Sequence, residues 1–257
     1  MQRSQSNTLQ YWSRTMLELH RLGLVNAGSQ VRISFAYLFR IKIHDKYMLV
    51  RNEHRPSVYQ PVGGAYKYFP SEAKFLVGHY QIRNDDGQIP DISKPGDYRM
   101  FVPGVYLKSF LQRFDQTSAR ESVLDLSREF VEEIINADIL PFSTIKYRYC
   151  GRHISEIHFS DYFQCYELLL ADIVELLPDH KQYRILSQYI NLTSPSFRFV
   201  TSKEIEDSRI MGQSFTDKFI IADHSYKILC ENESTLINVL SLSDIHEVSL
   251  KNSHNNR

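Results

Sequence analysis

The first part of the chain alternates between a helical and a strand-like pattern of apolar positions. Between residues 9 and 24, apolar side chains recur at intervals of three and four residues, which predicts an amphipathic helix. The runs 31–43 and 46–52 are rich in β-branched and aromatic residues and are joined by the short turn His44–Asp45. This arrangement predicts a β-hairpin.

A turn and a long interruption follow the predicted hairpin. Pro61 and the pair Gly63–Gly64 mark a tight turn. Beyond it, residues 75–82 (FLVGHYQI) are compatible with a strand, whereas residues 104–114 (GVYLKSFLQRF) have helical periodicity. Because apolar residues persist from 66 to 117, we expect this region to be an insertion on one domain rather than a linker.

The segment 119–137 predicts a helix that carries two separate stripes. Its apolar positions are three or four residues apart and should face a core. On the acidic stripe, each i,i+4 pair of like charges costs roughly 0.2–0.5 kcal/mol. A solvated acidic face with a local arginine network is one explanation, and a cation site is another. The apolar stripe consists of Val123, Leu126, Phe130 and Ile134, and the acidic stripe of Glu121, Asp125, Glu129, Glu132 and Glu133.

The second half of the chain contains further strand and helix patterns. Residues 145–159 and 161–174 predict another antiparallel pair. The polar tail after about residue 248 is expected to be disordered. Together these patterns predict an α+β fold in which helices flank antiparallel strands. Residues 180–190 are compatible with a helix, 197–207 with a strand and a short helix, and 219–229 with a strand or short helix.

Composition limits the class of partner. Of the 257 residues, 42% are hydrophobic and 23% are charged, which is ordinary for a soluble globular protein. The formal net charge of zero argues against a general electrostatic grip on nucleic acid or an anionic membrane. No apolar run approaches the roughly 18–20 residues of a membrane span, and the N-terminus does not resemble a signal peptide. With three widely separated cysteines, we expect a cytoplasmic protein with no direct nucleic-acid or membrane partner.

Three of the acidic residues have the spacing of metal ligands on a helix. Glu129, Glu132 and Glu133 stand at positions i, i+3 and i+4, so their carboxylates can converge on one point. Hard oxygen ligands of this kind suit Mg²⁺ or Mn²⁺, which keep waters and substrate phosphates as further ligands. An ion at that point would supply the positive charge that the stripe lacks.

The order of letters around these glutamates resembles a known family. Residues 128–133 read REFVEE, and residues 61–64 read PVGG after a predicted strand; together they resemble the motif of Nudix hydrolases. Three features depart from that motif. Gly64 and Arg128 are 64 positions apart instead of about fourteen, and Glu121 lies seven residues before Arg128 instead of eight. No glycine follows the paired glutamates.

A motif split in this way resembles a narrower group, the SMODS-associated Nudix domains of bacterial anti-phage operons that make cyclic-nucleotide signals. The resemblance implies a Nudix-like α/β/α sandwich with a mixed sheet, a catalytic helix and the insertion 66–117 overhanging the pocket. The domain would cover 31–247, with a helix and linker in 1–30 and a disordered tail in 248–257. The resemblance is carried by QPVGGAYK (60–67), DYRMFVPGVYLKSFL (97–111), ARESVLDLSREFVEEI (119–134) and FVTSKEIED…IIADHSYKIL (199–229).

The resemblance also implies roles for individual residues. Arg128 would orient a glutamate, and the general base would be Glu129 or, with a less regular spacing, Glu121. The implied cofactor is Mg²⁺ or Mn²⁺. The implied ligands are the backbone carbonyl of Gly64 and the carboxylates of Glu129, Glu132 and Glu133.

Candidate substrate contacts follow from position along the chain. Tyr66 and Lys67 come directly after the glycine turn, where they would contact a phosphate or stack on a base. Arg148 offers a cation on a predicted strand. Ordinary roles on a loop rim or a charged surface explain these residues at least as well.

Two classes of function remain open. The first is a Mg²⁺-dependent Nudix-type hydrolase of a nucleoside-diphosphate-linked or nucleotide-derived compound, acting in anti-phage signalling. The second is a catalytically inactive Nudix-fold sensor of a nucleotide second messenger, which the missing glycine and the displaced Glu121 favour. The retained run of mutually repelling glutamates favours the hydrolase. Because dimers are common in the broader family, a homodimer is also expected.

Overall fold

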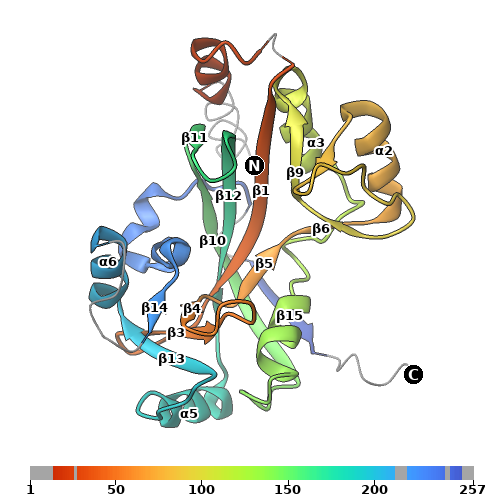
Figure 1. Cartoon of the computed structure of the whole chain (residues 1–257). Coiled ribbons are helices and arrows are strands. Elements are labelled where there is room, and N and C mark those ends of the chain that lie inside the picture. The colour runs from red at the N-terminus through yellow and green to blue at the C-terminus, as the bar shows by residue number, and fades with distance from the viewer. Residues whose placement is uncertain (1–13, 26–27, 212–218, 241–243, 251–257) are drawn as a thin grey trace.

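The computed structural model describes residues 14–25, 28–211, 219–240 and 244–250, and a long mixed sheet forms its centre (Figure 1). The strand order along this sheet is β15-β10-β12-β1-β9-β7, with β11 paired to β12 and β5 paired to β1. Only β1 and β12 pair in parallel within it. The strands are β1 (Gln30–Arg40), β5 (Gly63–Ala65), β7 (Arg83–Asn84), β9 (Arg99–Pro103), β10 (Thr144–Ile154), β11 (His158–Ser160), β12 (Cys165–Leu176) and β15 (Ile245–Ser249).

A smaller sheet continues from the end of β1, in the order β13-β3-β4-β14 with β2 paired to β3. Only the two residues of β2 fold back on β3, around His44 with its positive φ of 54°. The expected hairpin is therefore short, because β1 itself is hydrogen-bonded to β12 on one side and to β5 and β9 on the other. The strands are β2 (Lys42–Ile43), β3 (Lys46–Arg51), β4 (Val58–Gln60), β13 (Phe197–Thr201) and β14 (Ile220–Ile221).

The region 66–117 contributes two helices and part of the central sheet. The strand expected at 75–82 is wrong, because this run lies mostly in helix α2 (Pro70–Tyr80). Its buried residues Ala73, Leu76 and Tyr80 recur at three and four positions, which is helical spacing, and a proline in the first turn favours helix initiation. The helix expected at 104–114 is present as η1 (Gly104–Tyr106) and α3 (Leu107–Gln116), and the short strands β6 (Lys67–Tyr68) and β8 (Gly96–Asp97) pair with each other.

The acidic helix is shorter than expected. Residues 119–127 are not helical; the helix begins with α4 (Arg128–Phe130) and continues as the π-helix η2 (Val131–Ile135). The cause is pairing across the fold, because Arg120 bridges Tyr68 and the Glu121 N–H donates to the Lys67 carbonyl. The apolar stripe of this segment is nevertheless buried as expected, at Val123, Leu126, Phe130 and Ile134.

The remaining elements mostly follow the sequence pattern. Strands β10 and β12 form the expected antiparallel pair. The expected disorder from residue 248 is wrong at its start, because Val248 and Ser249 belong to β15 and Leu250 is buried; residues 251–257 lie outside the described part. Residues 14–21 are helical, and residues 1–13 also lie outside the described part. The other helices are α5 (His180–Tyr189), α6 (Ser202–Met211), η3 (Asp223–Ile228) and η4 (Cys230–Thr235).

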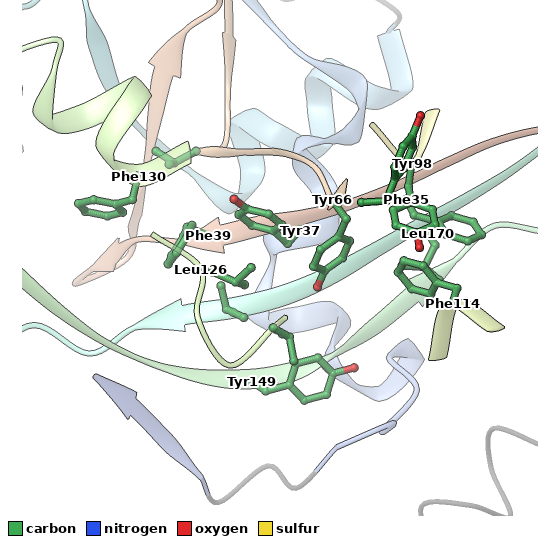
Figure 2. Close-up of a cluster of buried hydrophobic side chains, with 14 of the residues drawn as sticks. Phe35, Tyr37, Phe39, Tyr66, Tyr98, Phe114, Leu126, Phe130, Tyr149 and Leu170 are labelled. Atoms are coloured by element: carbon green, nitrogen blue, oxygen red, sulfur yellow. The ribbon is translucent and has the colours of Figure 1, made fainter. Parts of the chain in front are cut away.

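The predicted α+β class with a mixed sheet is confirmed, and the core lies on both faces of the central sheet. On one face, Phe35, Tyr37 and Phe39 of β1 meet a set of aromatic rings (Figure 2). Phe39 packs edge-on against Phe130, with 5.4 Å between ring centroids. This contact anchors the glutamate-bearing helix near the C-terminal end of β1. No helix in the described ranges has both the length and the apolar character needed to cross a membrane.

Candidate functional site

The glycine turn lies directly against β1 and the glutamate helix. Gly63 has a φ of 146°, and a Cβ there would collide with the Tyr37 carbonyl, so both backbone shape and space require glycine. A Cβ at Gly64 would collide with the carboxylate of Glu129. The two glycines at this turn therefore allow the partly buried Glu129 carboxylate to lie directly against the backbone of the turn.

Glu133 is bound to the other side of the same turn. Its Oε2 accepts a hydrogen bond from the Gly63 N–H at 2.8 Å, and its Oε1 accepts one from Gln60 Nε2 at 3.2 Å. Burial raises the pKa of Glu133 to about 8, although the Gly63 N–H acts in the opposite direction, and the nearby Glu129 adds to the rise. A second carboxyl group thus lies in a place where water solvates its charged form poorly.

Arg128 joins the acidic side chains to the turn. Its Nη1 donates to Glu129 Oε1 at 2.6 Å and to Glu132 Oε2 at 3.3 Å. Its Nη2 donates to the Ala65 carbonyl at 2.8 Å, and its Nε donates to Glu121 Oε1 at 2.6 Å. The single guanidinium therefore fixes the first turn of the helix relative to β5 and to the segment before the helix.

Glu121 has both of its carboxylate oxygens occupied. Besides Oε1, its Oε2 accepts from the Lys67 N–H at 2.8 Å and from Arg128 Nη2 at 3.1 Å. The expected placement of Glu121 and Asp125 on one helical stripe is wrong, because both lie before the helix begins. Glu121 holds Arg128 from an extended segment, so the regular spacing of a helix does not apply to it.

The site remains short of positive charge. Glu121, Glu129 and Glu132 share the guanidinium of Arg128, and Glu133 has only the neutral donors Gly63 and Gln60. Burial raises the pKa of Glu129 in spite of Arg128. In the part of the chain that the structure describes, no three acidic, histidine or cysteine side chains converge closely enough to hold a metal ion as they stand. The donors have the chemistry that Mg²⁺ prefers. Glu132, whose side chain is 52% exposed, has room to turn toward the other two.

The long gap in the motif is closed in space. The Phe69 N–H donates to the Ala119 carbonyl at 2.9 Å, and Tyr68 forms a bridge with Arg120, so the two ends of the insertion meet. Residues 69–118 account for 50 of the 64 positions between the glycine turn and Arg128. Without them fourteen positions remain, which is the spacing of the unsplit motif.

The expected substrate residues lie in different surroundings. Tyr66 is fully buried, and its hydroxyl donates to Asp172 at 2.8 Å. Lys67 lies beside the site, where its backbone N–H binds Glu121 and its Nζ pairs with Asp97 at 2.5 Å. Arg148 pairs with Glu175 at 2.5 Å on the surface of β10. Of the three, only Lys67 contacts the glutamate cluster directly.

Sequence reasoning missed Gln60, Tyr37 and the Ala65 carbonyl. Gln60 directly precedes the proline of the turn, so its position was the available signal. Tyr37 carries its hydroxyl toward the start of the helix, where the Glu129 N–H lies 3.5 Å from it. No local pattern indicated this contact, because the two residues are 92 positions apart.

Comparison with known proteins agrees with this geometry. A family model described as "SMODS-associated NUDIX domain" matches residues 30–229, which is most of the chain. The search of curated proteins and the search of solved structures each returned no match.

Proposed function

This chain belongs to the SMODS-associated NUDIX domain family, and we propose that it is a Mg²⁺-dependent hydrolase of a nucleoside-diphosphate-linked or nucleotide-derived compound. The observation that carries the proposal is the deficit of positive charge at the glycine turn. Glu129 and Glu133 are partly buried there, and burial raises the pKa of both, although Arg128 bonds Glu129. A divalent cation is the ligand that would relieve this repulsion.

The residues proposed to hold the cation are Glu129, Glu132, Glu133 and the backbone carbonyl of Gly64. When bound, Mg²⁺ or Mn²⁺ neutralises phosphate oxygens and lowers the pKa of a water ligand. Gln60 and the Gly63 N–H hold the Glu133 carboxylate in place against the turn. After the glutamates, where the motif has a glycine, the chain forms the π-helix η2, a feature frequent at functional sites.

Arg128 and Glu121 act as positioning residues in this proposal. Arg128 orients the carboxylate of Glu129 through the 2.6 Å hydrogen bond, and Glu121 fixes Arg128. Glu129 is the proposed general base, since its carboxylate lies against the glycine turn beside the proposed cation. Glu121 is a poorer candidate, because both of its oxygens already accept hydrogen bonds.

A second candidate is a sensor that binds a nucleotide messenger without turnover. The observation that favours it is that Arg128 already bonds Glu129 and Glu132, so among the described residues three ligands do not converge. In such a sensor, the Arg128 guanidinium would bind the anionic nucleotide messenger directly. The anti-phage role and the homodimer belong to the same proposal and stay predictions.

The decisive experiment separates ion binding from turnover. Mn²⁺ binding is measured by electron paramagnetic resonance, and hydrolysis is measured with Mg²⁺ and a panel of ADP-ribose, NAD, dinucleoside polyphosphates and cyclic oligonucleotides. We expect Mn²⁺ to bind, at least one compound to be hydrolysed, and both signals to be lost in the double variant Glu132→Gln, Glu133→Gln. The matched control is Glu206→Gln on α6, which should behave as wild type.

Each result has a defined meaning. Tight binding of a compound without turnover would establish the sensor instead of the hydrolase. Hydrolysis that survives unchanged in the double variant would show that the assigned site is wrong.

A further inference from the structure

A groove of about 730 Å³ opens beside the glutamate helix and is closed on its far side by β15. Figure 1 shows β15 beside this helix at the edge of the central sheet. The family match ends at residue 229, so β15 lies beyond the matched domain. The groove is lined by Leu124, Asp125, Ser127, Arg128, Val131, Glu132, Glu247, Val248 and Ser249.

Pairing and burial fix the strand that forms this wall. β15 runs antiparallel to β10 over five residue pairs, from Thr144 with Ser249 to Arg148 with Ile245. The buried side chain of Val248 anchors it, and Lys146 pairs with Glu247 across the strands at 3.2 Å. Backbone pairing with β10 and the buried Val248 therefore hold this wall in place.

The groove shares two side chains with the proposed cation site. Arg128 and Glu132 line the groove, and Arg128 is also bonded to Glu129 at the glycine turn. A substrate whose diphosphate lies at the glycine turn would extend its next chemical group past Arg128 and Glu132 toward the groove. The volume lies within the roughly 300–1,000 Å³ typical of small-molecule sites.

The lining selects the chemistry of that group. Val131 and Val248 are almost fully buried and give an apolar floor, and the half-exposed Leu124 extends it. Around the floor stand three carboxylates, of Asp125, Glu132 and Glu247, and one guanidinium. The carboxylates repel a phosphate but accept hydrogen bonds from hydroxyl and amino groups. A flat, uncharged ring that carries such donors fits this lining.

We propose that this groove binds the nucleoside part of the substrate and that β15 determines which substrates are accepted. The inference rests on the proposed function for the placement of the diphosphate. Leu124 and Ser249 would thus contact the nucleoside, whereas the glutamates hold the cation.

Binding measurements test the groove without requiring turnover. The probes are ADP, GDP, CDP and UDP, compared with methylenediphosphonate, which keeps the two phosphorus groups but lacks a nucleoside. Affinities are measured by calorimetry with Mn²⁺ present, and Mn²⁺ binding alone is followed by electron paramagnetic resonance. In the wild-type protein we expect at least one nucleotide to bind about tenfold or more tightly than methylenediphosphonate.

The variant Ser249→Trp fills the groove from an exposed strand position. It should abolish the preference for the nucleotide and leave Mn²⁺ and methylenediphosphonate binding unchanged. Leu124→Trp fills the groove from the opposite wall and should do the same if Ser249→Trp fails to fold. The matched control is Ile245→Trp on the same strand, because Ile245 is 62% exposed and is not among the lining residues.

The outcomes separate this inference from the proposed function. Nucleotides that bind no better than methylenediphosphonate would contradict nucleoside binding in the groove, even if the protein binds Mn²⁺. A preference for nucleotides that survives both groove-filling variants would contradict it as well. A nucleotide preference that Ser249→Trp removes, in a protein that does not bind Mn²⁺, would support the groove while contradicting the hydrolase.

Discussion

Two charged clusters lie close to β1, and they differ in how completely their charges are matched. In the buried cluster, Arg152 bonds both oxygens of Asp172 at 2.8 and 2.9 Å and also pairs with Asp115 at 2.6 Å. The hydroxyls of Tyr66 and Tyr149 donate to the same Asp172 carboxylate. Each charge in this cluster has a partner, and the remaining lone pairs accept hydrogen bonds.

The glutamate cluster at the glycine turn is unmatched by comparison. Arg128 serves three carboxylates there, and Glu133 depends on the neutral donors Gly63 and Gln60. Tyr66 connects the two regions, since it follows the glycine turn in sequence and bonds Asp172 in the core. The buried cluster fixes the sheet under the turn, whereas the glutamate cluster keeps unmatched negative charge, which is the feature on which the proposed cation site rests.

The largest expected effect comes from breaking the matched cluster. Asp172→Asn should lower the free energy of unfolding by about 3–5 kcal/mol, because it leaves a buried guanidinium without its main partner. Urea denaturation measures this change. As a control, Asp207→Asn removes the exposed pair with Lys203 and should cost about 0.5 kcal/mol or less. Equal losses in the two variants would contradict the structural role of Asp172.

Adding Mg²⁺ tests the unmatched cluster by the next largest effect. At 100 times its dissociation constant, the ion should raise the free energy of unfolding by about 2.7 kcal/mol. The double variant Glu129→Gln, Glu133→Gln should gain nothing from Mg²⁺, and without metal it should be no less stable than wild type, because it removes mutually repelling charges. Thermal melts with and without Mg²⁺ measure both. A metal-free loss as large as that of Asp172→Asn would show that the two clusters are alike.

A third region, around His153 and His224, has an excess of positive charge. We expect it to have a smaller effect on the free energy of unfolding, and one that depends on pH. Burial and the nearby Lys227 lower the pKa of His153 and of His224 to about 4; Arg209 adds to the effect at His153, and Arg55 and Arg99 add to it at His224. Both folded pKa values lie below the unfolded value near 6.5, so these histidines contribute stability above pH 6.5 that is lost as the pH falls toward 4.

The measurement compares variants, because Glu133 titrates in the opposite sense. Its folded pKa of about 8 lies above the unfolded value near 4.5, so its contribution falls as the pH rises toward 8. Between pH 7 and pH 4, His153→Gln should lose roughly 1–2 kcal/mol less stability than wild type. His158→Gln, a variant of an exposed histidine, should follow the wild-type curve. Parallel curves for wild type and His153→Gln would contradict the prediction.

The smallest effect on stability is expected when Gly64 is substituted, because the added Cβ meets only the flexible end of the Glu129 side chain. Gly64→Ala should cost less than about 1 kcal/mol and still weaken Mn²⁺ binding about tenfold, since the Glu129 carboxylate must move away. Gly63→Ala should cost more stability, because its neighbour is the Tyr37 backbone and its φ is positive. Denaturation and Mn²⁺ titration of both variants test this order.

The sequence predicted features that depend on neighbouring positions. The β-branched and aromatic run 31–43 predicted a strand, and the apolar stripe ending at Ile134 predicted a buried helical face. The letters REFVEE and PVGG identified the residues that the structure brings together at the turn. Local spacing suffices for these features because the periods of strands and helices are properties of adjacent residues.

Tertiary contacts decided the parts that the sequence missed. The helix starts at Arg128 rather than near residue 119, because Glu121 pairs with Lys67, 54 positions away. Likewise the chain stays ordered past residue 248, because β15 pairs with β10 across about a hundred residues. Hydrogen bonds between distant segments leave no periodic trace in either segment. The sequence alone therefore determined which residues supply the carboxylates and which form the core. Only the folded chain determined that the two ends of the insertion meet and that β15 faces the glutamate helix.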